Sequence, residues 1–367
     1  MPIDLTMQAS VLGMQDIRAI GGVPSEYLIQ DIVQLMEQEE QQHDSWFFNS
    51  DRTYEMLAIS GGGDKGAYGA GLLNGWTQAG TRPSFKIVTG ISTGAIIAPF
   101  AFVGSVYDMR LREFYTKYST KDIIKKRFLR NALATANPFK DLIEQNIDDD
   151  LIKKVALEYR KGRRLYIGTT NLDIQRLVIW DMGKIASLET PQAMDLFRKI
   201  ILASASIPVV FPPVILKVQA GDKSYDEMHV DGGVTKQVFF IHEIVQGVEI
   251  AAKKKGVDTS KLHYKIYVIQ NGFVSPVWKE VPNKLSAIAV RTMDTMTGAQ
   301  SVGDIYQLYV FTQRTHGDFN LAYIPESHLP EGRELFDPIA MKALFEIGFN
   351  QAVQGYVWRK TPPGLED

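Results

Sequence analysis

Two glycine-dense turns in the first third of the chain set the strongest constraint on its fold. The first is Gly-Gly-Gly-Asp-Lys-Gly at residues 61–66, and the second is Gly-Ile-Ser-Thr-Gly at residues 90–94. An apolar run precedes each turn and a helix-like segment follows it: Tyr54–Ile59 and Lys65–Gln78 for the first turn, Phe85–Thr89 and Thr93–Val103 for the second. A strand–turn–helix unit that occurs twice predicts an α/β protein with a mostly parallel central sheet.

Composition excludes several classes of function. The 367 residues carry a formal net charge of -2, so no global basic signature favours nucleic acid as a partner. Cysteine is absent, which removes disulfides, thiolate metal sites and a cysteine nucleophile together. The sequence also lacks the aspartate-rich pattern of a calcium-binding loop. We therefore expect neither a metal nor a cofactor.

One segment has the length of a membrane span. Residues 87–107 contain no charged side chain, but three glycines, a proline and several hydroxyl residues interrupt them. A buried strand, turn and helix explain this segment better than a transmembrane helix. No signal peptide is visible in the first 30 residues, so we expect a cytoplasmic or processed periplasmic protein that is at most peripheral to the membrane.

A basic stretch follows at Lys117–Arg130, where six basic residues face one acidic residue and apolar side chains are interleaved. Two interpretations stay open for it. The stretch is either a solvated pair of charged helices or a surface that contacts anionic lipid headgroups.

The second turn has the spacing of a nucleophile elbow. A serine on a tight strand-to-helix turn exposes its hydroxyl, and the flanking Gly90 and Gly94 permit the strained backbone that such a turn needs. The helix that follows directs its N-terminus at the site, which favours negative charge there. Ser92 is therefore the candidate nucleophile.

The first turn allows more than one interpretation. Successive N–H groups of Gly61, Gly62 and Gly63 can form an anion-binding nest, as an oxyanion hole requires. The run also matches the glycine pattern of a dinucleotide site, but that site needs an acidic residue about 20 positions later. No Asp or Glu lies between Lys65 and Tyr107. The oxyanion hole is the preferred interpretation, and a nucleotide-binding oxidoreductase is the alternative.

A serine nucleophile needs a base. None of the six histidines lies in a recognisable motif, and only His328, in a Ser-His-Leu-Pro segment, has a position that suits a triad. Asp231 is the better candidate because it follows an apolar–polar strand and precedes Gly232 and Gly233. It is also compatible with an ordinary Asp-Gly turn.

Four blocks of the sequence together resemble the patatin-like phospholipases. They are the glycine run at 60–66, the elbow at 90–94, Asp231-Gly232-Gly233, and the Ala-Ser-Ala-Ser-Ile-Pro-Val-Val-Phe-Pro-Pro segment at 203–213. The resemblance covers about half of the chain. It implies a three-layer α/β/α sandwich with helices on both faces of the sheet. We expect three parts in the chain: a helical N-terminal arm over residues 1–50, a hydrolase domain over 51–330, and a C-terminal helix over 331–367 that packs on the same domain.

The resemblance also implies roles for these residues. Ser92 would be the nucleophile and Asp231 its base, in a dyad without histidine, and Gly61, Gly62 and Gly63 would form the oxyanion hole. Lys65 and Gly66 would shape the loop without reacting. The expected substrate is a phospholipid, a lysophospholipid or another acyl-ester lipid, reached by transient peripheral contact with a membrane. A non-catalytic lipid-binding protein on the same scaffold is a further alternative.

Overall fold

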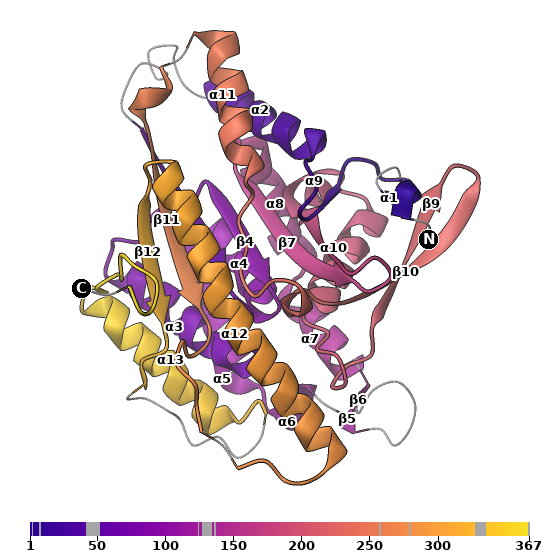
Figure 1. The fold of residues 1–367 in the computed structure, drawn as a ribbon, viewed down its shortest axis with the longest axis vertical. Coiled ribbons are helices and arrows are strands. Elements are labelled where there is room, and N and C mark those ends of the chain that lie inside the picture. The colour runs from indigo at the N-terminus through magenta and orange to yellow at the C-terminus, as the bar shows by residue number, and fades with distance from the viewer. Residues whose placement is uncertain are drawn as a thin grey trace.

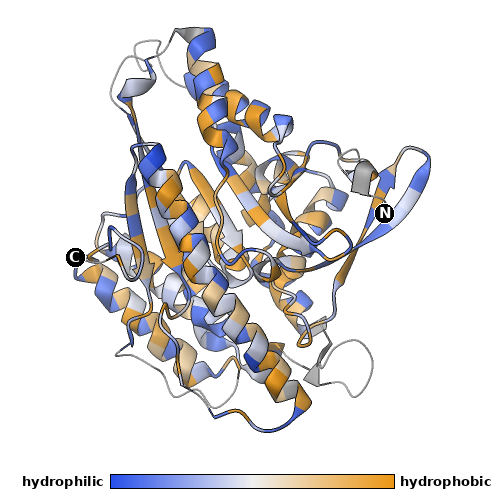
Figure 2. Cartoon of the chain, in the orientation of Figure 1, coloured by the Kyte–Doolittle hydropathy of each residue, from blue (hydrophilic) through white to orange (hydrophobic). Residues whose placement is uncertain are grey.

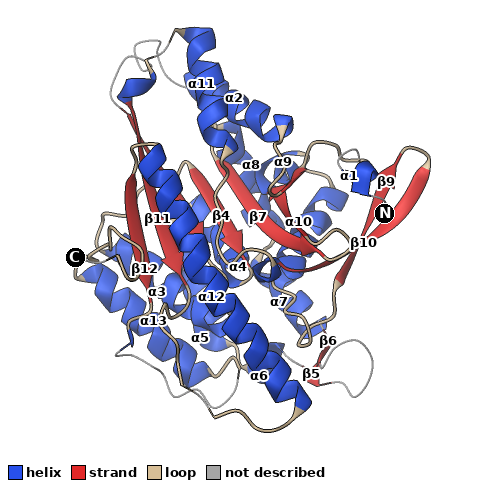
Figure 3. Cartoon of the chain, in the orientation of Figure 1, coloured by secondary structure: helices blue, strands red, loops and turns tan. Residues whose placement is uncertain are grey.

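The computed structural model describes residues 1, 3–6, 9–41, 52–123, 125–126, 134–135, 137–256, 258–278, 280–326 and 335–365. Within these residues, ten strands form one large sheet (Figures 1 and 3). They are β1 (Ser10–Val11), β2 (Arg18–Ile20), β3 (Arg52–Ile59), β4 (Ile87–Ile91), β7 (Arg164–Asn171), β8 (Arg176–Asp181), β9 (Val214–Ala220), β10 (Lys223–Asp231), β11 (Leu262–Gln270) and β12 (Asp318–Tyr323). Two short strands, β5 (Lys125–Lys126) and β6 (Ala134–Thr135), pair separately.

The helices cover both faces of the sheet (Figure 1). They are α1 (Ile3–Thr6), α2 (Glu26–Glu40), α3 (Gly66–Gln78), α4 (Thr93–Val103), α5 (Asp108–Lys117), α6 (Thr120–Ile123), α7 (Asn137–Asn146), α8 (Asp149–Arg160), α9 (Met182–Ser187), α10 (Pro191–Ser204), α11 (Glu243–Lys255), α12 (Leu285–Arg314) and α13 (Pro338–Val353). Among them, none is both long and apolar enough to cross a bilayer.

The sheet has a parallel part and an antiparallel part. Strands β7, β4, β3, β11 and β12 are parallel and adjacent in that order. Two further strands pair antiparallel with β7: β10 on the edge that β4 also uses, and β8 on the opposite edge. Strands β9, β1 and β2 extend this antiparallel region. The α/β class is therefore confirmed, with the parallel strands on one side of the sheet and β12 at its edge.

Alternation along the strands divides the core into two layers. On β3, Leu57 and Ile59 pack into one apolar cluster with helices α3, α4, α8, α10 and α13, whereas Met56 and Ala58 pack into another with α2, α11 and α12. Successive side chains of a strand point to opposite faces, so a sheet that is buried on both sides needs apolar residues at nearly every position. This arrangement is the three-layer sandwich that the sequence predicts.

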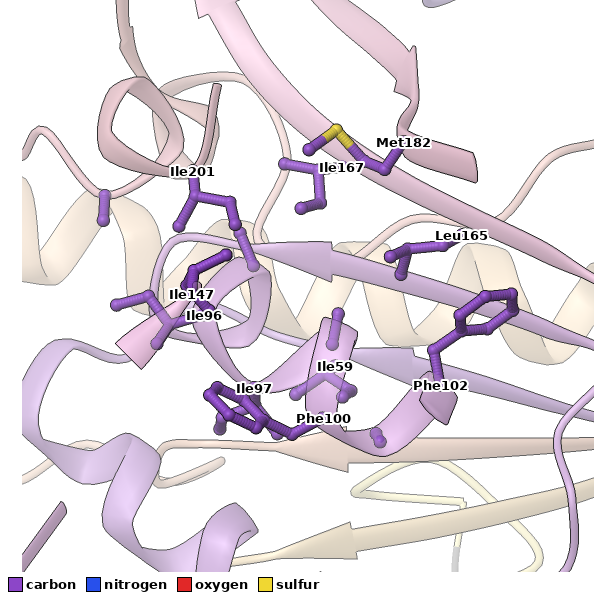
Figure 4. Close-up of a cluster of buried hydrophobic side chains, with 14 of the residues drawn as sticks. Ile59, Ile96, Ile97, Phe100, Phe102, Ile147, Leu165, Ile167, Met182 and Ile201 are labelled. Atoms are coloured by element: carbon purple, nitrogen blue, oxygen red, sulfur yellow. The ribbon is translucent and has the colours of Figure 1, made fainter. Parts of the chain in front are cut away.

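The first layer supports the elbow helix α4. Figure 4 shows Ile96, Ile97, Phe100 and Phe102 of α4 among side chains from the strands, including Ile59, Leu165 and Ile167. Residues 87–102 are all buried, which explains why this part of the segment contains no charge. The segment is a strand, a turn and a helix, as the sequence analysis preferred.

Close backbone contacts explain the glycines of α3. A Cβ atom added to Gly71 would lie 2.0 Å from the carbonyl oxygen of Phe345, and one added to Gly75 would lie 2.2 Å from that of Phe349, both on α13. Small residues in α3 therefore let the backbone of another helix approach. The C-terminal helix α13 occupies Pro338–Val353, within the expected 331–367 segment.

Residues of the expected N-terminal arm take part in the main sheet. Strand β1 pairs with β9, β2 pairs with β8, and α2 packs against α11. A buried ion pair holds α2 in place: Arg164, the first residue of β7, donates from Nε to Asp31 Oδ1 over 2.7 Å and from Nη2 to the Asp31 carbonyl over 2.9 Å. The division at residues 50 and 330 stays a prediction.

Replacing Asp31 by alanine tests this anchor. Because Arg164 would be left as a buried charge without its carboxylate, we expect the Asp31→Ala variant to lose about 3–5 kcal/mol of unfolding free energy. Glu37→Ala on the same helix removes an exposed ion pair with Lys254 and should cost about 0.5 kcal/mol. Urea denaturation of both variants measures the difference, and equal losses would contradict the anchoring role.

Candidate active site

Ser92 and Asp231 meet because two strands end against the same edge of β7. Residues 166–171 of β7 pair with β8 along one edge. Along the other edge β4 arrives from one direction and ends with Ile91 opposite Gly168, while β10 arrives from the opposite direction and ends with Asp231 opposite Thr169. The residue after Ile91 is therefore brought next to Asp231. The Oγ atom of Ser92 donates a hydrogen bond to Asp231 Oδ2 over 2.6 Å.

Ser92 has the strained backbone of a nucleophile elbow. Its φ of 54° and ψ of -121° lie in a region that residues with a side chain rarely adopt. The surrounding chain holds it there: the N–H of Ser92 donates to Ser204 Oγ over 2.9 Å, and its carbonyl accepts the first helical hydrogen bond of α4, from Ala95. Ser204 in turn donates to the carbonyl of Gly168 on β7.

Gly90 and Gly94 are required by close approach at the elbow. A Cβ atom on Gly90 would lie 2.4 Å from the carbonyl oxygen of Gly94, and one on Gly94 would lie 2.3 Å from that of Ile59. Gly66 has the same role between the two turns, since its Cβ would lie 2.0 Å from Thr93 Oγ1. These glycines allow the first turn, the elbow and β3 to pack directly against one another.

Asp231 is held from both sides. Its second carboxylate oxygen, Oδ1, accepts the N–H of Gly233 over 2.7 Å, and its own N–H donates to the carbonyl of Ser206. Gly232 packs on Gly168 O and Gly233 packs on the Gln237 side chain, each too closely for a Cβ atom. The Asp231-Gly232-Gly233 block is thus a tight turn that aims the carboxylate at Ser92.

Burial sets the acidity of Asp231. Removal of the carboxylate from water raises its pKa to about 7, although the hydrogen bonds from Ser92 and from the Gly233 N–H favour the ionised form. No charged side chain is among the causes of this shift. The carboxyl group is therefore able to gain and lose a proton near neutral pH, which a general base requires.

The first glycine turn lies beside Ser92. A Cβ atom on Gly61 would lie 3.3 Å from Ser92 Cβ, and Gly63 lines the same cavity as Ser92. The N–H of Gly61 is occupied, because it donates to the carbonyl of Gln237 over 2.9 Å. In the part of the chain that the structure describes, the N–H groups of Gly62 and Gly63 have no hydrogen-bond partner.

Asn271 clamps the base of this turn, a role that the sequence analysis missed. It follows β11, and its backbone and side-chain nitrogens donate to Ser60 Oγ and to the Ser60 carbonyl, while its Oδ1 accepts the N–H of Gly69. A Cβ atom on Gly62 would lie 1.9 Å from the Asn271 carbonyl oxygen. Lys65, by contrast, is partly exposed, and its Nζ lies 4.0 Å from Asp64 Oδ1, so within the described residues it ties the loop to no other element.

Apolar side chains enclose a cavity of about 30 Å³ in front of Ser92. Its walls come from α4, α5, α6, α7, α13 and the 203–213 segment: Gly63, Ser92, Thr93, Ile96, Phe114, Tyr115, Ile123, Phe139, Ala205, Ile207, Phe211, Phe336 and Met341. The rings of Phe139 and Phe211 stack with centroids 5.2 Å apart. Among the lining residues, Ser92, Thr93 and Tyr115 carry hydroxyl groups, and the others are apolar or glycine.

The 203–213 segment positions both members of the pair. Ser204 holds the N–H of Ser92 and the Ser206 carbonyl holds the N–H of Asp231, while Ile207 and Phe211 form cavity wall. The sequence analysis singled out this block but assigned no role to its serines. Their contacts are made across the fold, so spacing along the chain carries no signal for them.

Histidine takes no part in the described site. His229 is buried on β10, where its ring nitrogens contact Thr169 and Glu227. His328 and His43 lie outside the described residues, as does much of the basic stretch at 117–130, whose two interpretations stay open. Among the residues described, no group of three or more histidine and acidic side chains has the arrangement of a metal site.

The fold and these contacts define an α/β protein with a serine–aspartate pair on a nucleophile elbow. The patatin-like phospholipase family matches residues 57–241, which is about half of the chain and contains all four sequence blocks. The chain therefore belongs to this family.

Two further comparisons add little to that assignment. The comparison with curated proteins gave no match. Among solved structures, VipD from Legionella pneumophila aligns with a TM-score of 0.42 and 10% sequence identity, over 82% of this chain and 66% of that one, which is just under two thirds of its length. A likeness this distant carries no argument about activity.

The raised pKa of Asp231 predicts a stability effect that depends on pH. The folded state holds the Asp231 proton more tightly than the unfolded state, so this group stabilises the fold at low pH, and the contribution is lost as pH rises from about 4 to about 7. The Asp231→Asn variant keeps the shape without the charge. Its gain in unfolding free energy over the wild type should be about 2–3 kcal/mol larger at pH 8 than at pH 5.

Denaturant titrations at the two pH values measure this difference. Asp195→Asn, which removes an exposed carboxylate paired with Lys199, is the matched control and should show little dependence on pH. A gain for Asp231→Asn that is the same at both pH values would contradict the raised pKa.

The glycine turn gives a second prediction. The Gly62→Ala variant adds a methyl group where the Asn271 carbonyl lies, at a φ of 154°, so the turn must shift relative to Asn271 and its N–H groups change position. If the turn supplies the oxyanion donors of an ester hydrolase, as its N–H groups suggest, we expect a loss of ester hydrolysis of at least about 100-fold. Gly80→Ala, also at positive φ but with open space around it, should lose only about 1 kcal/mol of stability and keep its activity.

Proposed function

We propose that this protein hydrolyses acyl esters of phospholipids or lysophospholipids through a covalent acyl-Ser92 intermediate. The observation that carries the proposal is the 2.6 Å hydrogen bond from Ser92 Oγ to a buried carboxylate whose pKa is near 7. A serine hydroxyl becomes nucleophilic when a base takes its proton as it attacks. Asp231 is the group in contact with that proton.

In the first half of the reaction, Ser92 Oγ attacks the ester carbonyl while its proton passes to Asp231 Oδ2. The C–O bond to the leaving alcohol then breaks, and the alcohol takes the proton from Asp231. In the second half, Asp231 takes a proton from water, the resulting hydroxide attacks the acyl carbon, and Ser92 recovers its proton as the fatty acid leaves. Every proton that Asp231 accepts is returned within the same half-reaction.

The carbonyl oxygen gains negative charge in both halves and needs donors. Gly62 and Gly63 are the proposed donors, because their N–H groups have no partner within the described residues and Gly63 lines the cavity of Ser92. Gly61 shapes the loop instead, since its N–H is held by Gln237. The N-terminus of α4 adds favourable electrostatic potential at the same place.

Substitution of the pair tests the mechanism. We expect Ser92→Ala and Asp231→Asn each to lower kcat for p-nitrophenyl ester hydrolysis by at least about 1,000-fold, because either change removes the nucleophile or its base. Circular dichroism controls for folding. Full activity in either variant would show that the pair is not the catalytic machinery.

The dependence of activity on pH tests the base separately. Asp231 accepts the Ser92 proton only when it is ionised, so kcat/KM should rise with pH through an apparent pKa of about 7. The rate of Ser92 labelling by a fluorophosphonate should follow the same curve, since it needs the same proton transfer. A labelling rate that does not change between about pH 5 and pH 8 would contradict this role of Asp231.

The same labelling separates the alternatives. A non-catalytic lipid-binding protein on this scaffold would have an unactivated serine and would not react with the fluorophosphonate. A nucleotide-binding oxidoreductase would bind NAD(P)H at the 61–66 turn, which titration with fluorescence transfer from tryptophan detects. Mass analysis of the products from a lipid panel, with Ser92→Ala as the control, identifies the ester bond that is cleaved.

A further inference from the structure

The first half of α12 lies outside the packed body of the protein. This helix has 30 residues, and its buried residues, Ser301, Asp304, Ile305, Leu308 and Thr312, all fall in the second half. Of residues 285–300, none whose side chain the structure describes is buried. An isolated helical segment of this length is marginal in water, so a half-helix with so little buried surface is unusual in a globular protein.

The free half overhangs the edge of the sheet that carries Ser92. Strand β11 runs toward the edge where the parallel strands end, and α12 returns from that edge to the start of β12. Nine residues of strand span about 30 Å and 30 residues of helix about 45 Å, so the N-terminal end of α12 extends past the strands. Figure 1 shows this end projecting beyond the sheet.

Asp304 fixes the overhang relative to the site. Its carboxylate accepts the N–H of Gln237 over 2.7 Å and binds Lys236 Nζ over 2.8 Å. Both residues follow directly on the turn that carries Asp231, and Gln237 also holds Gly61 and Gly233. The helix is therefore attached at the active site and points outward from it.

Large apolar side chains gather on this overhang. Trp278 is 87% exposed and Leu285 is 85% exposed, and three partly exposed residues accompany them. We name this set the overhang patch: Trp278, Val281, Leu285, Ile288 and Met296. A groove of about 240 Å³ runs between the helix and the preceding loop and is lined by three of these residues. Figure 2 shows apolar residues at the free end of α12 and on that loop.

The loop that carries Trp278 is tied down on both sides. Arg291 on α12 donates from Nη2 to the Val277 carbonyl over 2.6 Å, and Ser275 Oγ bonds to Glu326, which follows β12. Trp278 is thus held out toward solvent by a fixed backbone. Exposing a tryptophan and a leucine to water is unfavourable, and a gathered apolar patch of this kind marks an interaction site.

A lipid surface is the occupant that fits this patch. The segment from 275 to 300 carries three basic residues and two acidic ones, so it offers no strong charge for a charged protein partner. Tryptophan is favoured at the boundary between headgroups and acyl chains, where leucine and isoleucine side chains also insert. The patch also lies at the edge of the sheet where β4 ends and Ser92 follows.

We propose that the overhang patch docks the protein on a lipid bilayer by inserting Trp278 and Leu285, and so turns the Ser92 edge toward the membrane. The proposal rests on the proposed function only in its choice of a lipid surface. Because apolar insertion drives the docking, zwitterionic vesicles suffice and added salt has little effect.

Vesicle binding tests the docking without catalysis. The Ser92→Ala protein, which leaves the lipid intact, is sedimented with phosphatidylcholine vesicles. It is compared with two double variants that also carry Trp278→Ser or Leu285→Ser. Each added substitution should lower the partition coefficient about tenfold. Val357→Ser is the matched control, since Val357 is 84% exposed but lies after α13 and outside the patch, and it should change nothing. Equal binding of all four proteins would overturn the proposal.

Activity distinguishes docking from the chemistry. With active Ser92, Trp278→Ser and Leu285→Ser should keep their rate on a soluble short-chain p-nitrophenyl ester and lose about tenfold on phosphatidylcholine vesicles. If the wild type cleaves neither substrate, the proposed function fails, and the sedimentation result still decides the docking. The wild type could instead fail to bind vesicles and form a dimer that Trp278→Ser dissociates. That result would overturn the membrane proposal and show that the patch binds a second copy of the chain.

Discussion

The site depends on the way one edge of β7 is shared between two strands. Strand β4 covers the first part of that edge and β10 the rest, so their ends meet at Gly168 and Thr169. A slip of either strand by one residue would turn its side chains to the opposite face and separate Ser92 from Asp231. The pair is therefore a result of strand register. The hydrogen bonds between Arg164 and Asp31 hold the start of β7, and so help to keep the strand register on which the Ser92–Asp231 contact depends.

Sequence reasoning succeeded where the constraint is local. The elbow helix has the predicted bounds, Thr93–Val103, because glycines, an apolar strand and an apolar helix follow one another without a gap. The α/β class and the family follow from such units. Strands β1 and β2 were missed, since two or three residues carry no readable period and their pairing partners lie far along the chain. The roles of Ser204, Ser206 and Asn271 were missed for the same reason.

Burial of Asp231 couples stability and chemistry. The same removal of water that raises its pKa toward 7 makes the ionised form costly, and the two hydrogen bonds from Ser92 and Gly233 offset only part of that cost. If Asp231 is the base, as we propose, a position nearer the surface would make it easier to ionise and a weaker base. The 203–213 segment contributes to both effects. Its apolar residues help to bury the Asp231 carboxylate, and Ser204 and Ser206 hold the backbone N–H groups of Ser92 and Asp231.

The small size of the cavity in front of Ser92 has a consequence for selectivity. About 30 Å³ holds a water-sized molecule and no acyl chain, and the stacked rings of Phe139 and Phe211 form part of the wall. If Ser92 is acylated as proposed, an acyl chain larger than this cavity must displace some of the side chains that line it. Selectivity between long and short chains would then depend on the free energy needed to separate these packed side chains.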